Sequence, residues 1–155
     1  MFTNRPSLGK PIRYGFKVWG LCSSSGYTVY LEPYCGASTQ LAKSSMGQGP
    51  DVVKGLLEKA DVSPGSHIYF DNLFTSLPLL VWMSEKGLGG TGTMTQTRMI
   101  AIPLPSRKTF EKQYERGEYS MIYHQDIVAV GWNDNKAVFL ASNIHLVTYR
   151  INVLY

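Results

Sequence analysis

Two stretches near the start of the chain alternate between apolar and polar residues, as strands with one buried face do. The first, "IRYGFKVWGLCS", carries Tyr14, Phe16 and Val18 on one side and Arg13 and Lys17 on the other. The second, "GYTVYLEPYCG", repeats this alternation after a serine-rich turn, and its proline indicates an edge strand or the end of a strand. The pattern predicts an antiparallel hairpin.

Helical spacing follows in two places. The apolar residues of "DVVKGLLEKA" recur on one face after Asp51, which suits the N-cap of a helix. In "LPLLVWMSEKG", Thr75 or Ser76 suits the N-cap and Gly87 the end of the helix. Both segments therefore predict helices, and the Gly/Ser-rich segment 36–50 predicts a loop.

The remaining pattern predicts short strands. "SHIYFDN" precedes the second helix and "GLGGTGTM" follows it, whereas the two prolines and mixed charge of 101–116 predict a loop. "DIVAVGW" and "KAVFLAS" flank the turn "WNDNK" and predict a hairpin. The order β-β-α-β-α-β, followed by a β-rich segment, predicts an α/β fold with a mixed sheet.

Composition and charge narrow the class of protein. Apolar residues make up 44% of the chain and charged residues 17%, which is typical of a globular domain. The net charge of +4 and pI of about 9.1 favour an anionic partner such as nucleic acid. We expect no membrane span, because the chain has no run of about 18 apolar residues. We expect no signal peptide, because the first residues contain no apolar core.

Cysteine and histidine positions do not predict a metal centre. We expect Cys22 and Cys35 to be reduced and mostly buried thiols. His67, His124 and His145 share no metal-ligand spacing with the cysteines, which makes structural zinc unexpected.

Asp71 follows the apolar strand residues 68–70 and precedes a helix. Ligands of open α/β sheets bind beyond the carboxyl ends of strands, and a carboxylate there suits a divalent cation such as Mg²⁺. The alternative is that Asp71 or Asn72 closes a turn or caps the helix. Spacing alone leaves both interpretations open.

A basic run with interleaved aromatics surrounds the first predicted strand. Arg5, Lys10, Arg13 and Lys17 suit contacts to DNA phosphates, and the aromatics suit base stacking. Alternatively, the aromatics fill the core and the cations are solvated. "GLGGTGT" resembles a phosphate-binding loop, but it runs from a helix to a strand, which favours a helix end and a turn.

Four stretches resemble, in this order, the core of piggyBac-type transposases and the host proteins derived from them: "KPIRYGFKVWGLC…GYTVYLEPYCG", "YFDNLFTSLPLL", "GTGTMTQTR" and "WNDNKAVFLASN". The resemblance runs from about Asn4 to about Asn143. It implies an RNase H-like nuclease domain whose three aspartates hold two divalent metals, Mg²⁺ or Mn²⁺, for DNA strand transfer. Asp71 matches the second aspartate. Arg98 matches a family arginine, although Thr95 and Thr97 stand where a basic residue and an asparagine are usual.

The sequence also departs from the family pattern. The first family aspartate lies upstream of the matched region, and the third lies downstream near "GGVD", so we expect both to be missing here. Other aspartates stand in the wrong contexts: Asp51, Asp61, Asp126 and Asp134. The cysteine-rich zinc-binding tail of the family is missing too.

These observations lead to one set of expectations. Residues 1–100 form a partial RNase H-like core that lacks the first strand and the last helix, and 101–155 form a β-rich insertion and an unmatched tail. We expect a fragment of a transposase-derived protein that is inactive by itself. We expect it to act in the nucleus with DNA as its partner, and a homo-oligomer is one option for its assembly. The alternatives are a non-enzymatic DNA-binding or chromatin-associated host module, and a partial version of an active recombinase.

Overall fold

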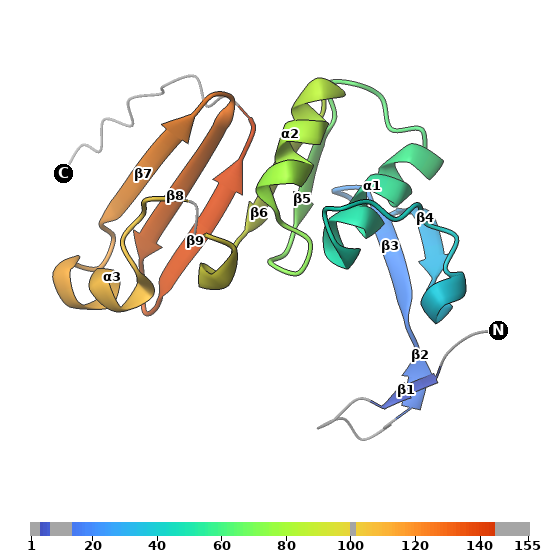
Figure 1. The fold of residues 1–155 in the computed structure, drawn as a ribbon, viewed down its shortest axis with the longest axis horizontal. Helices are drawn as coiled ribbons and strands as arrows, with labels where there is room; N and C mark the ends of the chain where they lie inside the picture. The colour runs from blue at the N-terminus through green and yellow to red at the C-terminus, as the bar shows by residue number, and fades with distance from the viewer. Residues whose placement is uncertain (1–3, 7–13, 100–101, 145–155) are drawn as a thin grey trace. The chain divides into compact units, whose positions relative to one another are not determined.

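The computed structural model describes residues 4–6, 14–99 and 102–144, and the chain divides into two compact units, 1–62 and 63–155 (Figure 1). The first unit contains, in order, β1 (Asn4–Pro6), β2 (Tyr14–Phe16), β3 (Val18–Cys22), β4 (Thr28–Pro33), the 3-10 helix η1 (Gly36–Ser38) and α1 (Gln48–Lys59). The second contains β5 (His67–Phe70), α2 (Leu77–Glu85), β6 (Gly89–Thr93), the 3-10 helix η2 (Gln96–Arg98), α3 (Arg107–Gln113), β7 (Tyr119–His124), β8 (Ile127–Asn133) and β9 (Ala137–Ser142).

The predicted hairpin forms, as β3 and β4, but its buried face is not the one that the apolar alternation marks. Trp19 pairs with Glu32, and both are buried on the side where α1 contacts the two strands. Phe16, Val18 and Leu31 are 69%, 48% and 56% exposed. The expectation that the aromatics of this run mostly fill the core is therefore wrong for Phe16. Tertiary packing determines which face of the hairpin is buried, because α1 covers only one side of it.

Helix α1 begins earlier than predicted. Its first residue is Gln48 and its N-cap is Gly47, so Asp51 lies inside the first turn and is not the cap. The apolar face is as predicted, because Val52, Val53, Leu56 and Leu57 are all buried. Burial of that face therefore stabilises α1, as tertiary packing does for most helices in proteins.

The thiols differ from expectation. Cys22 and Cys35 are free, but Cys22 is exposed and Cys35 half-buried. Cys22 lies at the end of β3, and the alternating burial of this strand leaves it exposed together with Val18 and Gly20.

The second unit contains a five-stranded sheet in the order β5-β6-β9-β8-β7. β5 and β6 are parallel and the other pairs are antiparallel, so the sheet is mixed, as predicted. β9 pairs with β6, which means that one sheet continues across residue 100, where the sequence suggested a division. The division into a core and an insertion stays a prediction.

Helix α2 follows its sequence signals closely. The hydroxyl of Ser76 accepts a hydrogen bond from the backbone N–H of Leu79 at 3.3 Å, which makes Ser76 the N-cap. Gly87 has φ +67°, the left-handed conformation that favours glycine after a helix. Leu79, Leu80 and Met83 are fully buried, and Met83 and Leu80 approach Gly90 of β6. The segment "GLGGTGT" is therefore a helix end and a strand.

Residues 101–116 were expected to be a loop, but they contain helix α3, capped by Ser106. Phe110 on this helix is fully buried and packs edge-on against Phe139 of β9, with ring centroids 5.6 Å apart. A Cβ on Gly131 would meet the Phe110 ring at 2.6 Å, so a glycine on β8 provides the space. The burial of Phe110 stabilises α3. The sequence of this short segment does not reveal that burial by itself.

Asn143 is buried just after β9 and joins three elements. Its Nδ2 donates to the carbonyls of Leu80 and Leu88 and to the Ser84 hydroxyl, while its Oδ1 accepts from the backbone N–H of Gly90 at 2.6 Å. A buried amide with all these partners fixes the end of α2 against β6 and β9.

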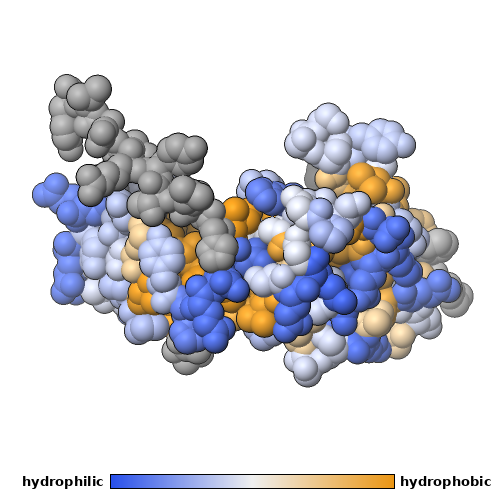
Figure 2. Space-filling view, turned by 90° about the horizontal axis from the view of Figure 1, so that it is seen from above, coloured by the Kyte–Doolittle hydropathy of each residue, from blue (hydrophilic) through white to orange (hydrophobic). Residues whose placement is uncertain are grey.

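Large apolar side chains also remain at the surface. In the second unit, Tyr69, Tyr119, Tyr123 and Trp132 are between 43% and 73% exposed. Figure 2 shows hydrophobic residues at the surface between hydrophilic ones. No helix within the described ranges is long and apolar enough to cross a membrane.

Candidate functional site

Asp71 follows directly after β5 and is exposed. β5 runs parallel to β6, so Asp71 stands at the carboxyl-end edge of a parallel strand pair. This is the position at which open α/β sheets bind their ligands. The structure therefore places Asp71 where the strand pattern predicted it.

The carboxylate of Asp71 also closes a turn. Its Oδ1 accepts a hydrogen bond from the backbone N–H of Leu73 at 2.8 Å. No donor to Oδ2 is found in the part of the chain that the structure describes. The turn interpretation and the ligand interpretation are thus compatible, because one oxygen closes the turn and the other stays available. The helix cap, by contrast, is Ser76.

The backbone of this turn is held by Thr75, which is fully buried. The Thr75 hydroxyl donates to the carbonyl oxygen of Asp71 at 2.8 Å, and the backbone N–H groups of Thr75 and Phe74 donate to the same oxygen at 3.2 Å. Three donors on one carbonyl fix the main chain from which the carboxylate projects.

Arg98 approaches the same turn from the segment after β6. Its Nη1 donates to the carbonyl oxygen of Thr75 at 2.7 Å. Two residues that the sequence singled out separately, Asp71 and Arg98, are therefore connected through Thr75. The sequence did not assign Thr75 this role, and the available signal was a threonine four residues after an aspartate that ends a strand.

Lys17 lies in the first unit and is engaged there. Its Nζ lies 3.7 Å from the centroid of the Trp19 ring and 5.5 Å from that of Tyr34. This cation–π contact holds the lysine against its own domain. Arg13 lies outside the described residues. DNA contact by Arg13, Lys17 and Arg98 stays a prediction.

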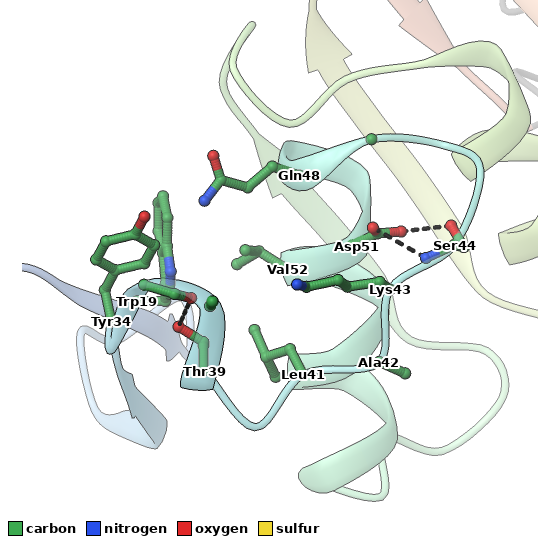
Figure 3. Close-up of a pocket in the computed structure, with 13 residues that line it drawn as sticks. Trp19, Tyr34, Thr39, Leu41, Ala42, Lys43, Ser44, Gln48, Asp51 and Val52 are labelled. Atoms are coloured by element: carbon green, nitrogen blue, oxygen red, sulfur yellow. Dashed lines mark hydrogen bonds between the residues drawn. The ribbon is translucent and has the colours of Figure 1, made fainter. Parts of the chain in front are cut away.

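A hollow of about 410 Å³ lies in the first unit (Figure 3). Trp19 and Tyr34 form one end, and the Gln48 amide points toward them, while the Lys43 side chain extends toward Val52. Its lining also includes Asp51, a carboxylate that is already hydrogen-bonded to Ser44. The hollow is not lined by Asp71, Lys17 or Arg98, although Lys17 contacts two residues that line it, Trp19 and Tyr34.

Metal-ligating residues do not gather into a complete site. Among the described residues, no three His, Cys, Asp or Glu side chains form a group that could hold a metal ion. Asp71 would therefore supply one ligand of a larger set. A carboxylate oxygen is nevertheless the type of ligand that Mg²⁺ and Mn²⁺ prefer, and Mg²⁺ commonly uses only one or two protein carboxylates.

Comparison with known proteins identifies the class. The family model described as Transposase IS4 matches residues 5–151. The chain therefore belongs to the Transposase IS4 family.

Its relatives are of the piggyBac type, which confirms the resemblance read from the sequence. The chain is 34% identical over 138 residues to the human PiggyBac transposable element-derived protein 3, and 33% identical over 140 residues to the human PiggyBac transposable element-derived protein 2. Each alignment covers 87% of this chain and 23% of the relative. The chain thus spans about a quarter of the length of these relatives.

A solved structure supports the fold. A cryo-EM structure of the piggyBac transposase synaptic complex with hairpin DNA matches with a TM-score of 0.74 and 24% sequence identity. The match covers 92% of this chain and 30% of that chain. The mixed α/β architecture is therefore similar to that of part of this transposase.

Proposed function

We propose that this chain is part of the catalytic domain of a DNA transposase and that Asp71 is one of the carboxylates that bind Mg²⁺ or Mn²⁺. The observation that carries the proposal is the position of Asp71. It stands at the carboxyl end of β5, beside the parallel strand β6, with one carboxylate oxygen in a turn and the other available. Family membership supports the proposal, because transposases act on DNA.

The proposed metals would supply the chemistry. When bound in such enzymes, paired divalent cations stabilise the attacking and leaving oxygens during displacement at a DNA phosphodiester. Such metals lie about 3.5–4 Å apart, so one carboxylate does not hold both. The role of this chain is to present Asp71 at a fixed place on the sheet edge.

We further propose that the sheet is an incomplete RNase H-like sheet. β5 is one of the two edge strands of this sheet among the described residues, and the unpaired N–H and C=O groups of an edge strand can pair with a further strand. A further strand and a helix in a longer polypeptide would complete the fold and bring the other aspartates. On this proposal the 155-residue chain does not cut or join DNA by itself.

A cleavage assay tests the proposal. The purified chain is incubated with supercoiled plasmid and either Mg²⁺ or Mn²⁺, beside the variant Asp71→Asn, which keeps an oxygen for the turn and loses the charge. We expect no metal-dependent nicking by either protein. Nicking by the wild-type chain that disappears in Asp71→Asn would refute the proposed inactivity while supporting the role of Asp71.

A second assay addresses the metal directly. Mn²⁺ broadens the NMR signals of nearby nuclei, so a titration should broaden the backbone amide signals of residues 71–74 in the wild-type protein. Asp71→Asn should abolish this broadening. Equal broadening in both proteins would overturn the assignment of Asp71 as a metal ligand.

The proposed partner is DNA, the proposed compartment the nucleus, and self-association is a further expectation. Binding to duplex DNA should weaken steeply with salt, because phosphate contacts release counterions. DNA binding without any Mn²⁺ effect at residues 71–74 would instead favour the non-enzymatic DNA-binding module. The mass of the protein in solution, measured with and without DNA, tests whether it forms a homo-oligomer.

A further inference from the structure

Arg98 is placed to act on the Asp71 turn. The residue is exposed overall and ends η2, yet its guanidinium reaches across to a main-chain carbonyl 23 residues away, that of Thr75, at 2.7 Å. A hydrogen bond with a charged donor is stronger than a neutral one. The guanidinium has five N–H donors, and this bond uses one of them.

Thr75 transmits the contact to Asp71. Its carbonyl accepts from Arg98, and its hydroxyl and backbone N–H both donate to the Asp71 carbonyl. Since Thr75 is fully buried, its hydroxyl has no water to replace a lost partner. Movement of Thr75 would therefore move the backbone of Asp71.

Strand β6 packs directly against the turn that contains Asp71 and Thr75. Gly92 pairs with Phe70, the residue just before Asp71. A Cβ on Gly92 would collide with the hydroxyl of Thr75 and would lie 2.6 Å from the Phe70 ring. The turn thus rests directly on the backbone of β6, in a space that only glycine leaves open.

We infer that Arg98 and Thr75 are positioning residues that hold the Asp71 carboxylate in the orientation needed to bind a divalent cation. This inference rests on the proposed function of Asp71 as a metal ligand. Metal ligands work only within narrow geometric limits, and the residues that orient a ligand contribute substantially to metal affinity. Arg98 thereby gains a role within the protein in addition to its predicted contact with DNA.

The charge of Arg98 and its hydrogen bond to the turn predict opposite effects of substitution on cation binding, so the inference is testable. Removing a positive charge near a carboxylate should strengthen cation binding by reducing repulsion. Releasing the turn should weaken it. We therefore compare Arg98→Gln with Arg107→Gln. Arg107 is exposed at the start of α3, so its substitution removes the same charge from the same unit and leaves the turn intact.

The first measurement is Mn²⁺ broadening of the amide signals of residues 71–74 in the 155-residue protein. Arg98→Gln should weaken the apparent Mn²⁺ affinity about tenfold. Arg107→Gln should leave it unchanged or strengthen it slightly. An Arg98→Gln protein that binds Mn²⁺ as well as or better than the wild type would overturn the inference.

The second measurement uses no metal. Hydrogen exchange at the backbone N–H groups of Phe74 and Thr75, which both bond to the Asp71 carbonyl, reports directly on the turn. Exchange should accelerate about tenfold in Arg98→Gln and in Thr75→Val, each of which loses one hydrogen bond, and should stay near wild type in Thr75→Ser, which keeps the hydroxyl. Unchanged exchange in Arg98→Gln would also overturn the inference. If Thr75→Val does not fold, the Arg98 and Arg107 variants decide.

The controls separate this inference from the proposed function. If Asp71→Asn leaves the Mn²⁺ effect intact, the proposed metal role of Asp71 fails. If Asp71→Asn abolishes that effect while Arg98→Gln changes neither measurement, the metal role stands and the positioning role fails.

Discussion

Asp51 and Asp71 both stand near the start of a helix, and the fold uses the two carboxylates in opposite ways. Asp51 is 7% exposed, and its two oxygens accept from the backbone N–H and the hydroxyl of Ser44. Asp71 is exposed and has one oxygen bonded to Leu73 within the turn. A carboxylate whose oxygens are both occupied inside the protein stabilises a loop, whereas one with an available oxygen at a sheet edge can meet a ligand. Substitutions at the two aspartates test this difference, and substitutions at Gly92 and Glu32 extend it to the support of the Asp71 turn and to a third carboxylate.

The largest effect should come from Asp51→Ala. Removing the buried acceptor leaves the donors of Ser44 without their partner, and we expect the free energy of unfolding to fall by about 3 kcal/mol. Urea denaturation gives the value, with Asp71→Ala as the matched variant. A loss for Asp51→Ala no larger than that for Asp71→Ala would remove the contrast.

Gly92→Ala should come next and concerns the support of the Asp71 turn. The added methyl group would collide with Thr75 and Phe70, which should lower the free energy of unfolding by about 2 kcal/mol through overpacking. Gly15→Ala is the control, because a Cβ there meets nothing within 4 Å. Equal stability of the two variants in urea would show that the turn does not rest on β6.

A third carboxylate, Glu32, is as buried as Asp51 but is paired with a cation. Lys59 Nζ lies 2.8 Å from its Oε2, and this hydrogen bond raises the pKa of Lys59 above its usual value of 10.5. Because the pKa is raised in the folded state, the stabilisation is complete below pH 10.5 and is lost as the pH rises through the folded pKa.

Glu32→Gln tests that pairing. Urea denaturation at about pH 9 and about pH 11 should show wild-type stability falling more between the two values than that of Glu32→Gln, which lacks the charge that retains the proton. The comparison between proteins cancels the titration of other groups. Identical pH dependence would exclude a contribution from the Lys59–Glu32 pair.

The smallest effect on stability should be that of Asp71→Asn. The side chain is exposed, and asparagine keeps an oxygen for the Leu73 N–H, so we expect a change within about 0.5 kcal/mol. Urea denaturation checks this value. A much larger loss would make Asp71 a structural residue like Asp51.

The sequence predicted the local features that depend on neighbouring residues. Ser76 and Gly87 marked the limits of α2, and the turn "WNDNK" marked the β8–β9 hairpin. It also placed Asp71 after a strand, since a strand followed by an acidic residue and a helix cap is visible in a few letters. Its resemblance to piggyBac-type transposases was likewise contained in short motifs.

Features that depend on distant contacts escaped prediction. Helix α3 exists because Phe110 is buried against Gly131 and Phe139, which the segment 101–116 does not reveal. The exposed side of the β3–β4 hairpin is the more apolar one, because α1 packs on the Trp19 side. The sequence contexts of Asp51 and Asp71 differ, but only the fold shows that both oxygens of Asp51 are hydrogen-bonded to Ser44, whereas one oxygen of Asp71 is bonded to Leu73.

The sequence by itself determined the order of most elements, the approximate limits of α2 and the position of an aspartate at a strand end, because these follow from residues close together in the chain. Only the tertiary structure decided that Asp71 keeps an available oxygen, that Thr75 connects it to Arg98, and that Gly92 leaves room for the turn. These contacts join residues that are distant in sequence, and hydrogen bonding and steric fit between them arise only when the sheet has formed.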